Sequence, residues 1–261
     1  MHTPTTTRCI QFDRGVVDTK LYCKTILTFF LCIVACLMLV PKIMAIDTGF
    51  STKNISKEEE DKFISYNDIS IVTEEPPKSV ISCFDVKENG MYALGHDDGK
   101  RKTISIYSAD GTFLYGYAFN CDGIFGIEWN NDNINIYFCR DERLAEIDQK
   151  GEVVHVVYVE SNSENSAYFR KVLSSNKKEI PGKTYVIKND LSIFDIFSDS
   201  RSQLVVETTE NKLLFYDASS VQLTNAIVIG ALVTVFVSII VYAVIWNVKK
   251  ESKKTVECGA F

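Results

Sequence analysis

The chain has 261 residues and a formal net charge of −6, with 46% hydrophobic and 24% charged residues. This composition excludes an intrinsically disordered chain and a coiled coil. The charge is divided unevenly, because residues 46–223 hold 19 Lys and Arg against 30 Asp and Glu, a net −11, whereas the two ends together hold 9 against 4, a net +5. Phosphate binding needs clustered positive charge, so the acidic bulk argues against nucleic acid as a partner.

A short tail, residues 1–24, precedes the first apolar segment at 25–45. About 20 helical residues cross a bilayer, so this segment is predicted to be a transmembrane helix or signal anchor. A cleaved signal peptide is the alternative, since Ala45 is a small residue suited to a cleavage site. The long leader and the bulky Ile43 favour the anchor.

The second apolar segment, residues 226–246, contains no charged side chain and predicts a transmembrane helix over 225–248. Basic residues on the cytoplasmic side of a span set its orientation. They lie before the first segment and after the second, in the basic tail 249–261: Arg8, Arg14, Lys20 and Lys24, then Lys249, Lys250, Lys253 and Lys254. We therefore expect a protein that crosses the cell membrane twice, with both termini cytoplasmic, the central region outside and the lipid bilayer as a partner.

The central region is predicted to begin with a solvated stalk over 46–62, because this stretch is polar and charged. An all-β domain is expected over 63–222, opening with strands at 63–66 and 69–72.

From residue 80 a repeat of four short strands emerges. The first copy has strands at 81–86, 91–94, 103–107 and 113–119, with a hairpin turn at Asp110-Gly111. The second begins 43 residues later, with strands at 124–129, 134–138, 144–148 and 153–159. A shortened third copy is predicted from strands at 193–197, 204–207 and 212–217, after an insertion that holds a strand at 184–187. Four strands every 40–45 residues or so is the spacing of a β-propeller blade.

The repeats resemble the blades of β-propeller proteins of the NHL and senescence-marker types, over roughly residues 80–217. The best local matches are Asp110-Gly111, residues 115–119 and residues 125–129. The chain also looks like two-span membrane proteins of Gram-positive bacteria that place such a domain outside the cell. The resemblance implies a partial or small propeller of 3–4 four-stranded blades, because 156 residues at this spacing give about 3.6 blades, and complete propellers have about four to eight. Residues 63–72 could close the ring, a second copy could complete it, or the blades could stay an open stack.

Lactone-hydrolysing propellers hold a metal among carboxylates and amides at the ring centre. The resemblance would place the following residues in that role: Asp85, Glu128, Asn130, Asp132 and Asp195. The alternative is that these residues serve strand ends and turns, where Asp and Asn are common.

Two of the three histidines lie in the central region. His96-Asp97-Asp98 is the one cluster with metal-type ligands, and it is interpreted as a solvated hairpin tip; His155 is interpreted as an ordinary strand residue. Zinc, phosphate-loop, dinucleotide and nucleophile-elbow motifs are absent from the sequence, so we expect no metal and no cofactor, and no catalytic residue is assigned.

Exposed aromatic side chains are the candidate binding residues: Tyr92, Tyr117, Trp129 and Tyr137. Most of the four are nevertheless expected to belong to the core. Of the eight cysteines, Cys83, Cys121 and Cys139 fall outside the membrane in this topology, and a Cys83–Cys121 disulfide competes with buried free thiols.

The short tails leave no room for a cytoplasmic output domain, so any signal must pass through a partner. The leading hypothesis is a membrane-anchored binding module of unknown ligand, acting with a protein partner or by self-association. The alternatives are an accessory subunit of a membrane transport or secretion complex and an extracytoplasmic metal-dependent hydrolase.

Overall fold

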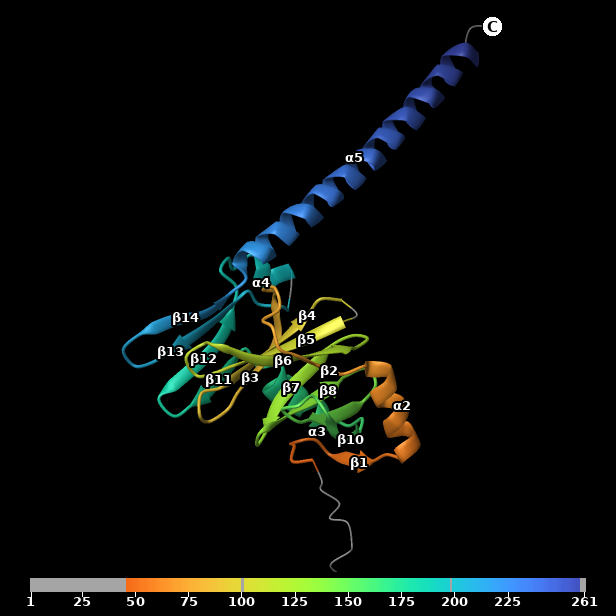
Figure 1. The fold of residues 1–261 in the computed structure, drawn as a ribbon. Helices are drawn as coiled ribbons and strands as arrows, with labels where there is room; N and C mark the ends of the chain where they lie inside the picture. Colours follow the sequence, from red (N-terminus) through yellow and green to blue (C-terminus); the bar gives the residue numbers. More distant parts are fainter. Residues whose placement is uncertain (1–45, 100, 198, 259–261) are drawn as a thin grey trace, which may run out of the picture. The chain divides into compact units, whose positions relative to one another are not determined.

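The computed structural model describes residues 46–99, 101–197 and 199–258, and three antiparallel β-sheets make up most of this part (Figure 1). Within each sheet, most neighbouring strands are also consecutive in the chain and are joined by hairpins. The helical elements are α2 (Lys57–Asn67), α3 (Ser163–Tyr168), the π-helical turn η1 (Phe169–Leu173), α4 (Phe194–Phe197) and α5 (Ser219–Cys258).

The first sheet confirms the four strands predicted for the first repeat and adds a fifth. In spatial order it contains β2 (Ser70–Val72), β6 (Phe113–Asn120), β5 (Arg101–Tyr107), β4 (Tyr92–Asp97) and β3 (Ile81–Val86). The predicted turn joins β5 to β6, where Gly111 has a φ of +90°, a conformation that glycine adopts without a steric penalty. Strand β2 pairs with β6 at the edge of the sheet, so it extends this sheet and closes no ring.

The second sheet confirms the second repeat. Its spatial order is β1 (Thr52–Asn54), β10 (Val153–Val159), β9 (Arg143–Ile147), β8 (Asn133–Phe138) and β7 (Phe125–Asn130). Each of the four predicted strands is found within a few residues of its expected bounds. The extra strand β1 comes from the segment before the repeats and pairs with β10.

The third sheet differs from the prediction in its first half. It runs β11 (Lys177–Ile180), β12 (Lys183–Lys188), β13 (Gln203–Glu207) and β14 (Lys212–Asp217), so it is a complete four-stranded sheet. The strand expected at 184–187 is confirmed, but the supposed insertion supplies both of the first two strands. The strand expected at 193–197 is wrong: this segment turns back on itself as α4, with hydrogen bonds such as Phe194 N to Leu191 O (3.1 Å).

The strand predicted at 63–66 is also wrong, because these residues belong to α2. The Ser56 side chain accepts a hydrogen bond from the Glu59 backbone, and the Glu59 carboxylate accepts one from the Ser56 backbone. Such a capping box satisfies two backbone donors at a helix start, where no preceding turn can do so. Asp68 ends the helix in a left-handed conformation with a φ of 46°.

The expected stalk at 46–62 is folded onto the second sheet. Ile46 and Phe50 are buried against Leu144 and Val159, and β1 runs beside β10. The polarity that suggested a stalk belongs to the exposed face of α2, while the two apolar side chains at the start of the segment reach the core.

Apolar side chains pack the sheets against one another. Strand β3 of the first sheet lies against β7 of the second, and β11 and β12 of the third also contact β3. One cluster joins the first two sheets through residues such as Ile104, Phe119 and Ile136, and another joins the first and third through Tyr92 and Tyr185. The described sheets do not close into a ring or barrel.

Helix α5 begins at a buried polar junction with the third sheet. Ala218 donates its N–H to Ser202 O (2.8 Å), and the Gln222 side-chain amide donates to Asn189 Oδ1 (2.8 Å). Within the part from Ser219 to Trp246, the most apolar 18 residues have a mean hydropathy of 2.8 and none of them is buried, so the length and composition of this part make it a candidate membrane span. The first apolar segment, 25–45, lies outside the described residues.

Candidate functional site

A hollow of about 670 Å³ lies between α2 and the turn that joins β8 to β9. Its polar lining includes Glu59 and Lys62 from α2, and Asp141 and Arg143 from the turn and the start of β9. Tyr66, with 51% of its surface exposed, adds an aromatic ring. We call this the α2 hollow. It combines both signs of charge with an exposed ring, which suits the recognition of a polar molecule.

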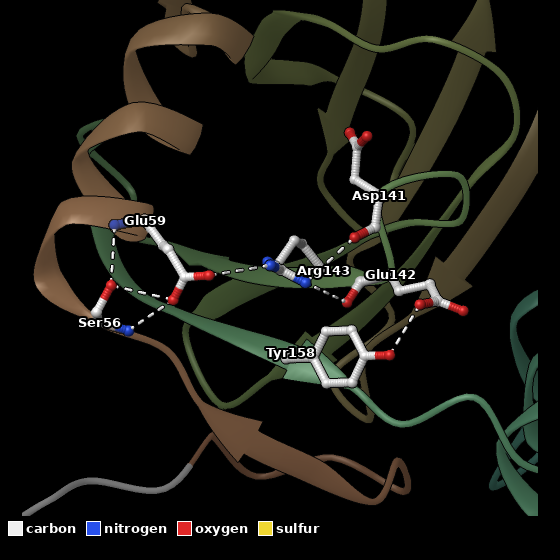
Figure 2. Close-up of polar contacts among 6 residues, drawn as sticks. All are labelled: Ser56, Glu59, Asp141, Glu142, Arg143 and Tyr158. Carbon is white, nitrogen blue, oxygen red and sulfur yellow. Dashed lines mark hydrogen bonds and ion pairs between the residues drawn. The ribbon is translucent and has the colours of Figure 1, made fainter.

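Arg143 is the most constrained charge of the α2 hollow (Figure 2). Its Nη1 donates to the backbone oxygens of Asp141 (3.3 Å) and Glu142 (3.5 Å), and its guanidinium lies 4.9 Å from the centre of the Tyr158 ring. Its Nη2 is 3.9 Å from Glu59 Oε1, which is longer than a direct charge-assisted hydrogen bond. The guanidinium is therefore held in place while its pairing with the carboxylate stays loose.

Glu59 faces Arg143 because its other oxygen is fixed at the helix start. Glu59 Oε2 accepts hydrogen bonds from Ser56 N and Ser56 Oγ, both at 3.0 Å. These bonds, led by the one from the backbone N–H and helped by Arg143, hold the pKa of Glu59 below its usual value. The carboxylate is thus ionised at neutral pH, with Oε1 turned toward Arg143 (Figure 2).

A second hollow of about 630 Å³ lies on the other side of the same turn. Cys139 and Glu142 face it, together with Tyr137 and the start of α3. Tyr158 donates its hydroxyl to Glu142 Oε2 (2.9 Å), and this hydrogen bond raises the pKa of Tyr158. One short turn therefore separates two polar hollows and contributes side chains to both.

The structure places the four predicted aromatic binding residues differently from one another. Tyr92 and Tyr117 are fully buried, so they belong to the core, as expected for most of this set, and cannot contact a ligand. Trp129 is partly buried, with the Lys87 ammonium 5.5 Å from its ring centre. Tyr137 alone reaches one of the two hollows, where burial raises its pKa to about 12.

The prediction of a solvated tip holds for Asp97 and Asp98, which are exposed where β4 leads into β5, but it is wrong for His96. His96 lies in β4 and is buried, with Nδ1 3.2 Å from Val80 O, and burial lowers its pKa. Asp97 pairs with Lys102, and Asp98 accepts a hydrogen bond from Ser79. The reason is that β4 extends three residues beyond its predicted end and carries His96 under the neighbouring chain at Val80. His155 lies within β10, as predicted.

The carboxylates considered for a central metal are divided among separate contacts. Asp85 accepts from Trp129 N (2.8 Å) and pairs with Lys178, whereas Asp195 accepts from Asn189 and lies 3.7 Å from Arg201. Across residues 46–99, 101–197 and 199–258, no three His, Cys, Asp or Glu side chains group closely enough to hold a metal ion.

The other members of that set are also engaged. Asn130 donates to Glu146 (3.1 Å), and Asp132 pairs with Lys87. Glu128 is buried, and its carboxylate accepts hydrogen bonds from the side chains of Thr48 (2.5 Å), Tyr168 (2.5 Å) and Asn135 (3.2 Å). These bonds tie the chain near Thr48 to the second sheet, so Glu128 has a structural role here.

Cys83, Cys121 and Cys139 are all free thiols, so the Cys83–Cys121 disulfide weighed as an alternative is not formed. Burial raises the pKa of Cys121 to about 11 and that of Cys139 to about 12, and it raises the pKa of Cys83 further. Since the thiolate is the reactive form of cysteine, none of the three is poised as a nucleophile.

Sequence reasoning did not find the α2 hollow. Its two sides come from α2, whose residues the sequence predicts as part of a stalk and a strand, and from the turn between the predicted strands 134–138 and 144–148. The spacing Ser56-x-x-Glu59 was the available signal, because Ser followed three residues later by Glu is typical of a helix start.

Comparisons with family models, with curated proteins and with solved structures gave no match, so the geometry of the chain itself carries the functional argument.

Proposed function

We propose that the protein is a membrane-anchored, extracytoplasmic binding module that recognises a polar partner through the α2 hollow. The single observation that carries the proposal is the Arg143 guanidinium, fixed by two backbone carbonyls and a tyrosine ring yet only loosely paired with Glu59. A ligand that offers both an acceptor and a donor can bridge the two charges without displacing the groups that position Arg143.

The anchoring part of the proposal is supported by α5. Its apolar segment is followed by Lys249, Lys250, Lys253 and Lys254, whereas the β domain before it is acidic. Basic residues favour the cytoplasmic side of a span, which puts the β domain outside. The apolar segment 25–45, with basic residues before it, supports a second span and two cytoplasmic termini.

The β domain is proposed to be propeller-like. Its three antiparallel sheets are built mostly from consecutive strands, and the first strand of each of the first two repeats, β3 and β7, lies at the contact between the two sheets. Contact through these strands supports the interpretation of the two sheets as neighbouring blades. An open stack of three blades would leave the loops of the second sheet free for binding.

Binding is favoured over catalysis by the state of the reactive groups. The thiols have raised pKa values, His96 is buried with a lowered pKa, and Asp85 and Glu128 are already hydrogen-bonded or ion-paired. An activated nucleophile needs the opposite, namely a lowered pKa or an adjacent free base. The hydrolase alternative therefore has less support than the binding module.

The span itself favours an anchor over a subunit that packs through polar contacts. Thr234 and Ser238 each donate their hydroxyl to a carbonyl one turn earlier in α5, at 2.8 Å. Polar groups in lipid need a partner, and these two have one within their own helix.

Photo-crosslinking tests the proposal directly. Benzoylphenylalanine in place of Tyr66 sits in the α2 hollow, and irradiation of intact cells that carry the full chain is expected to give one discrete adduct. Adding Arg143→Ala is expected to abolish that adduct, because the ligand loses its main charged contact.

The matched control is benzoylphenylalanine in place of Leu213, which is 51% exposed like Tyr66 but lies on β14. Equal adducts at both positions, or an adduct at position 66 that survives Arg143→Ala, would show that the α2 hollow is not the recognition site.

A further inference from the structure

Residues 191–197 carry apolar side chains on the outside of the β domain. Ile196 is 74% exposed and Ile193 is 54% exposed, and Leu191 is half-exposed beside them. These three lie within seven residues, in the short connection that contains α4. A cluster of exposed aliphatic side chains of this kind is typical of a surface that contacts a membrane or an apolar protein surface.

The same segment lies against the start of α5. Together they line an apolar pocket of about 550 Å³. Its apolar lining comes from the β domain on one side and from α5 on the other: Val80, Ile193 and Phe194, then Ala226, Ile229 and Gly230. Space is open beside Gly230, where an added Cβ would meet no atom within 4 Å.

The length of the apolar stretch fixes the depth of this contact. Residues 226–246 lie between Asn225 and Asn247 and number 21, and at about 1.5 Å per residue they span roughly 31 Å of helix. The hydrocarbon core is also about 30 Å thick, so residue 226 must lie at its boundary. Ile229 and Gly230 follow three and four residues later, about 5 Å further along the helix axis. Ile193 and Phe194, which line the same pocket, are then level with the bilayer surface.

The acidic residue within the segment is bonded to protein groups, although 49% of its side chain is exposed. Asp195 Oδ1 accepts a hydrogen bond from Asn189 Nδ2 (2.8 Å) and lies 3.7 Å from Arg201 Nε. Asp190, just before the segment, accepts a hydrogen bond from Gln203 Nε2 through its Oδ1 (3.5 Å). The carboxylates are therefore engaged with protein groups, and the isoleucines on either side of Asp195 form the outward face.

We propose that residues 191–197 form an interfacial segment that inserts Leu191, Ile193 and Ile196 into the lipid bilayer beside α5. This inference rests on the proposed function, because it requires α5 to span the membrane. Its occupant is the lipid itself, since the exposed face is continuous with the lipid-facing surface of the span. Insertion of this segment beside α5 restricts how the β domain can tilt and rotate above the membrane.

Tryptophan quenching in vesicles tests the insertion with the full chain. The protein is reconstituted in phosphatidylcholine vesicles that contain lipids brominated high on the acyl chain, near the head group. In a Trp129→Phe, Trp246→Phe background, Ile196→Trp is expected to show blue-shifted emission and to lose most of its fluorescence to the brominated lipid. Leu214→Trp, at a position 52% exposed on β14, is the matched control and is expected to keep its fluorescence.

Trp246 in a Trp129→Phe protein reports separately on α5. If Trp246 is quenched but Ile196→Trp is quenched no more than Leu214→Trp, the inserted segment is ruled out while the membrane anchor stands. If Trp246 is not quenched either, the anchor and the inserted segment both fail. Leu191→Trp and Ile193→Trp give the same readout, so the test does not depend on one variant that folds poorly.

Discussion

Two corners of the β domain use similar polar groups in opposite surroundings. At the start of α2, Ser56, Glu59 and Arg143 form an exposed network around the α2 hollow. At the start of α5, Asn189 and Gln222 form a buried one with the Ser202 backbone. Each corner holds the beginning of a helix against a sheet with side-chain hydrogen bonds. One borders water, and the other lies beside the apolar pocket.

The difference shows that burial, more than the number of contacts, decides what such a network contributes to stability. A hydrogen bond at the surface is exchanged for one with water at small cost when it is lost. A buried donor or acceptor left without its partner keeps its full desolvation penalty. The α2 corner is thus free to rearrange around a ligand, whereas the α5 corner must stay formed.

The largest effect is expected from Asn189→Ala. This change leaves the buried Gln222 amide without its acceptor and removes one of the two acceptors of the Ser202 N–H, which keeps the Lys188 backbone oxygen. At about 1–3 kcal/mol for an unsatisfied buried group, the free energy of unfolding should fall by about 2 kcal/mol. Chemical unfolding of the detergent-solubilised full chain, followed by tryptophan fluorescence, measures it.

Asn176→Ala is the control for this variant, because that side chain is exposed, and it should change the free energy of unfolding by no more than about 0.5 kcal/mol. If the two variants unfold alike, the buried junction contributes no more than the surface does, and the contrast between the corners disappears.

An intermediate effect is expected from Ser56→Ala, which removes the N-cap of α2. The loss should be about 1 kcal/mol, and it should appear first as faster hydrogen exchange at the Glu59 amide. Ser56→Asp retains a capping acceptor and should restore most of the protection. Unchanged exchange at Glu59 in Ser56→Ala would mean that α2 is held by packing alone.

The smallest effect concerns pH. The pKa of Glu59 is lowered mainly by the Ser56 backbone N–H and also by the Ser56 hydroxyl. The ionised carboxylate therefore stabilises the start of α2 at pH values above 4.5, the ordinary pKa of glutamate. This contribution is lost as the pH falls through the lowered pKa, because protonation weakens the acceptor. An NMR titration of the Glu59 carboxyl carbon should show its pKa moving up toward 4.5 in Ser56→Ala. The shift should be partial, because Ser56→Ala keeps the backbone N–H, and an identical titration in both proteins would contradict a contribution from the Ser56 hydroxyl.

The parts of the fold that could be predicted are those in which local pattern and tertiary contact agree. Strands β3 to β10 are short runs rich in apolar residues, β5 and β8 alternate apolar and polar residues, and several of the turns between them contain glycine, so the local pattern survives in the fold. Strand β11 has the sequence Lys-Lys-Glu-Ile, with no apolar face to detect, and it forms because β12 pairs with it. Residues 193–197 have a strand-like pattern, but a turn stabilised by Asp195 and Asn189 prevails over it.

The candidate site was less accessible to sequence reasoning. The capping-box spacing at Ser56 is a sequence signal for the start of α2. The order of residues does not predict that Glu59 and Arg143 lie close together, since they belong to elements far apart in the chain. The burial of His96 depends in the same way on the chain at Val80 passing over the end of β4. Such contacts follow from how elements are arranged in space, which period and spacing do not encode.

The free thiols have a consequence for how the domain behaves in an oxidising compartment. Cys83 and Cys121 belong to the apolar cluster that joins the first two sheets, and Gly95 leaves room for the Cys83 sulfur where any side chain would collide with it. Oxidants and alkylating reagents act on thiolates, and burial keeps these sulfurs protonated and out of reach. Oxidation or alkylation of these cysteines would therefore require the two sheets to separate, and the modified thiols would remain as evidence that the interface between the sheets had opened.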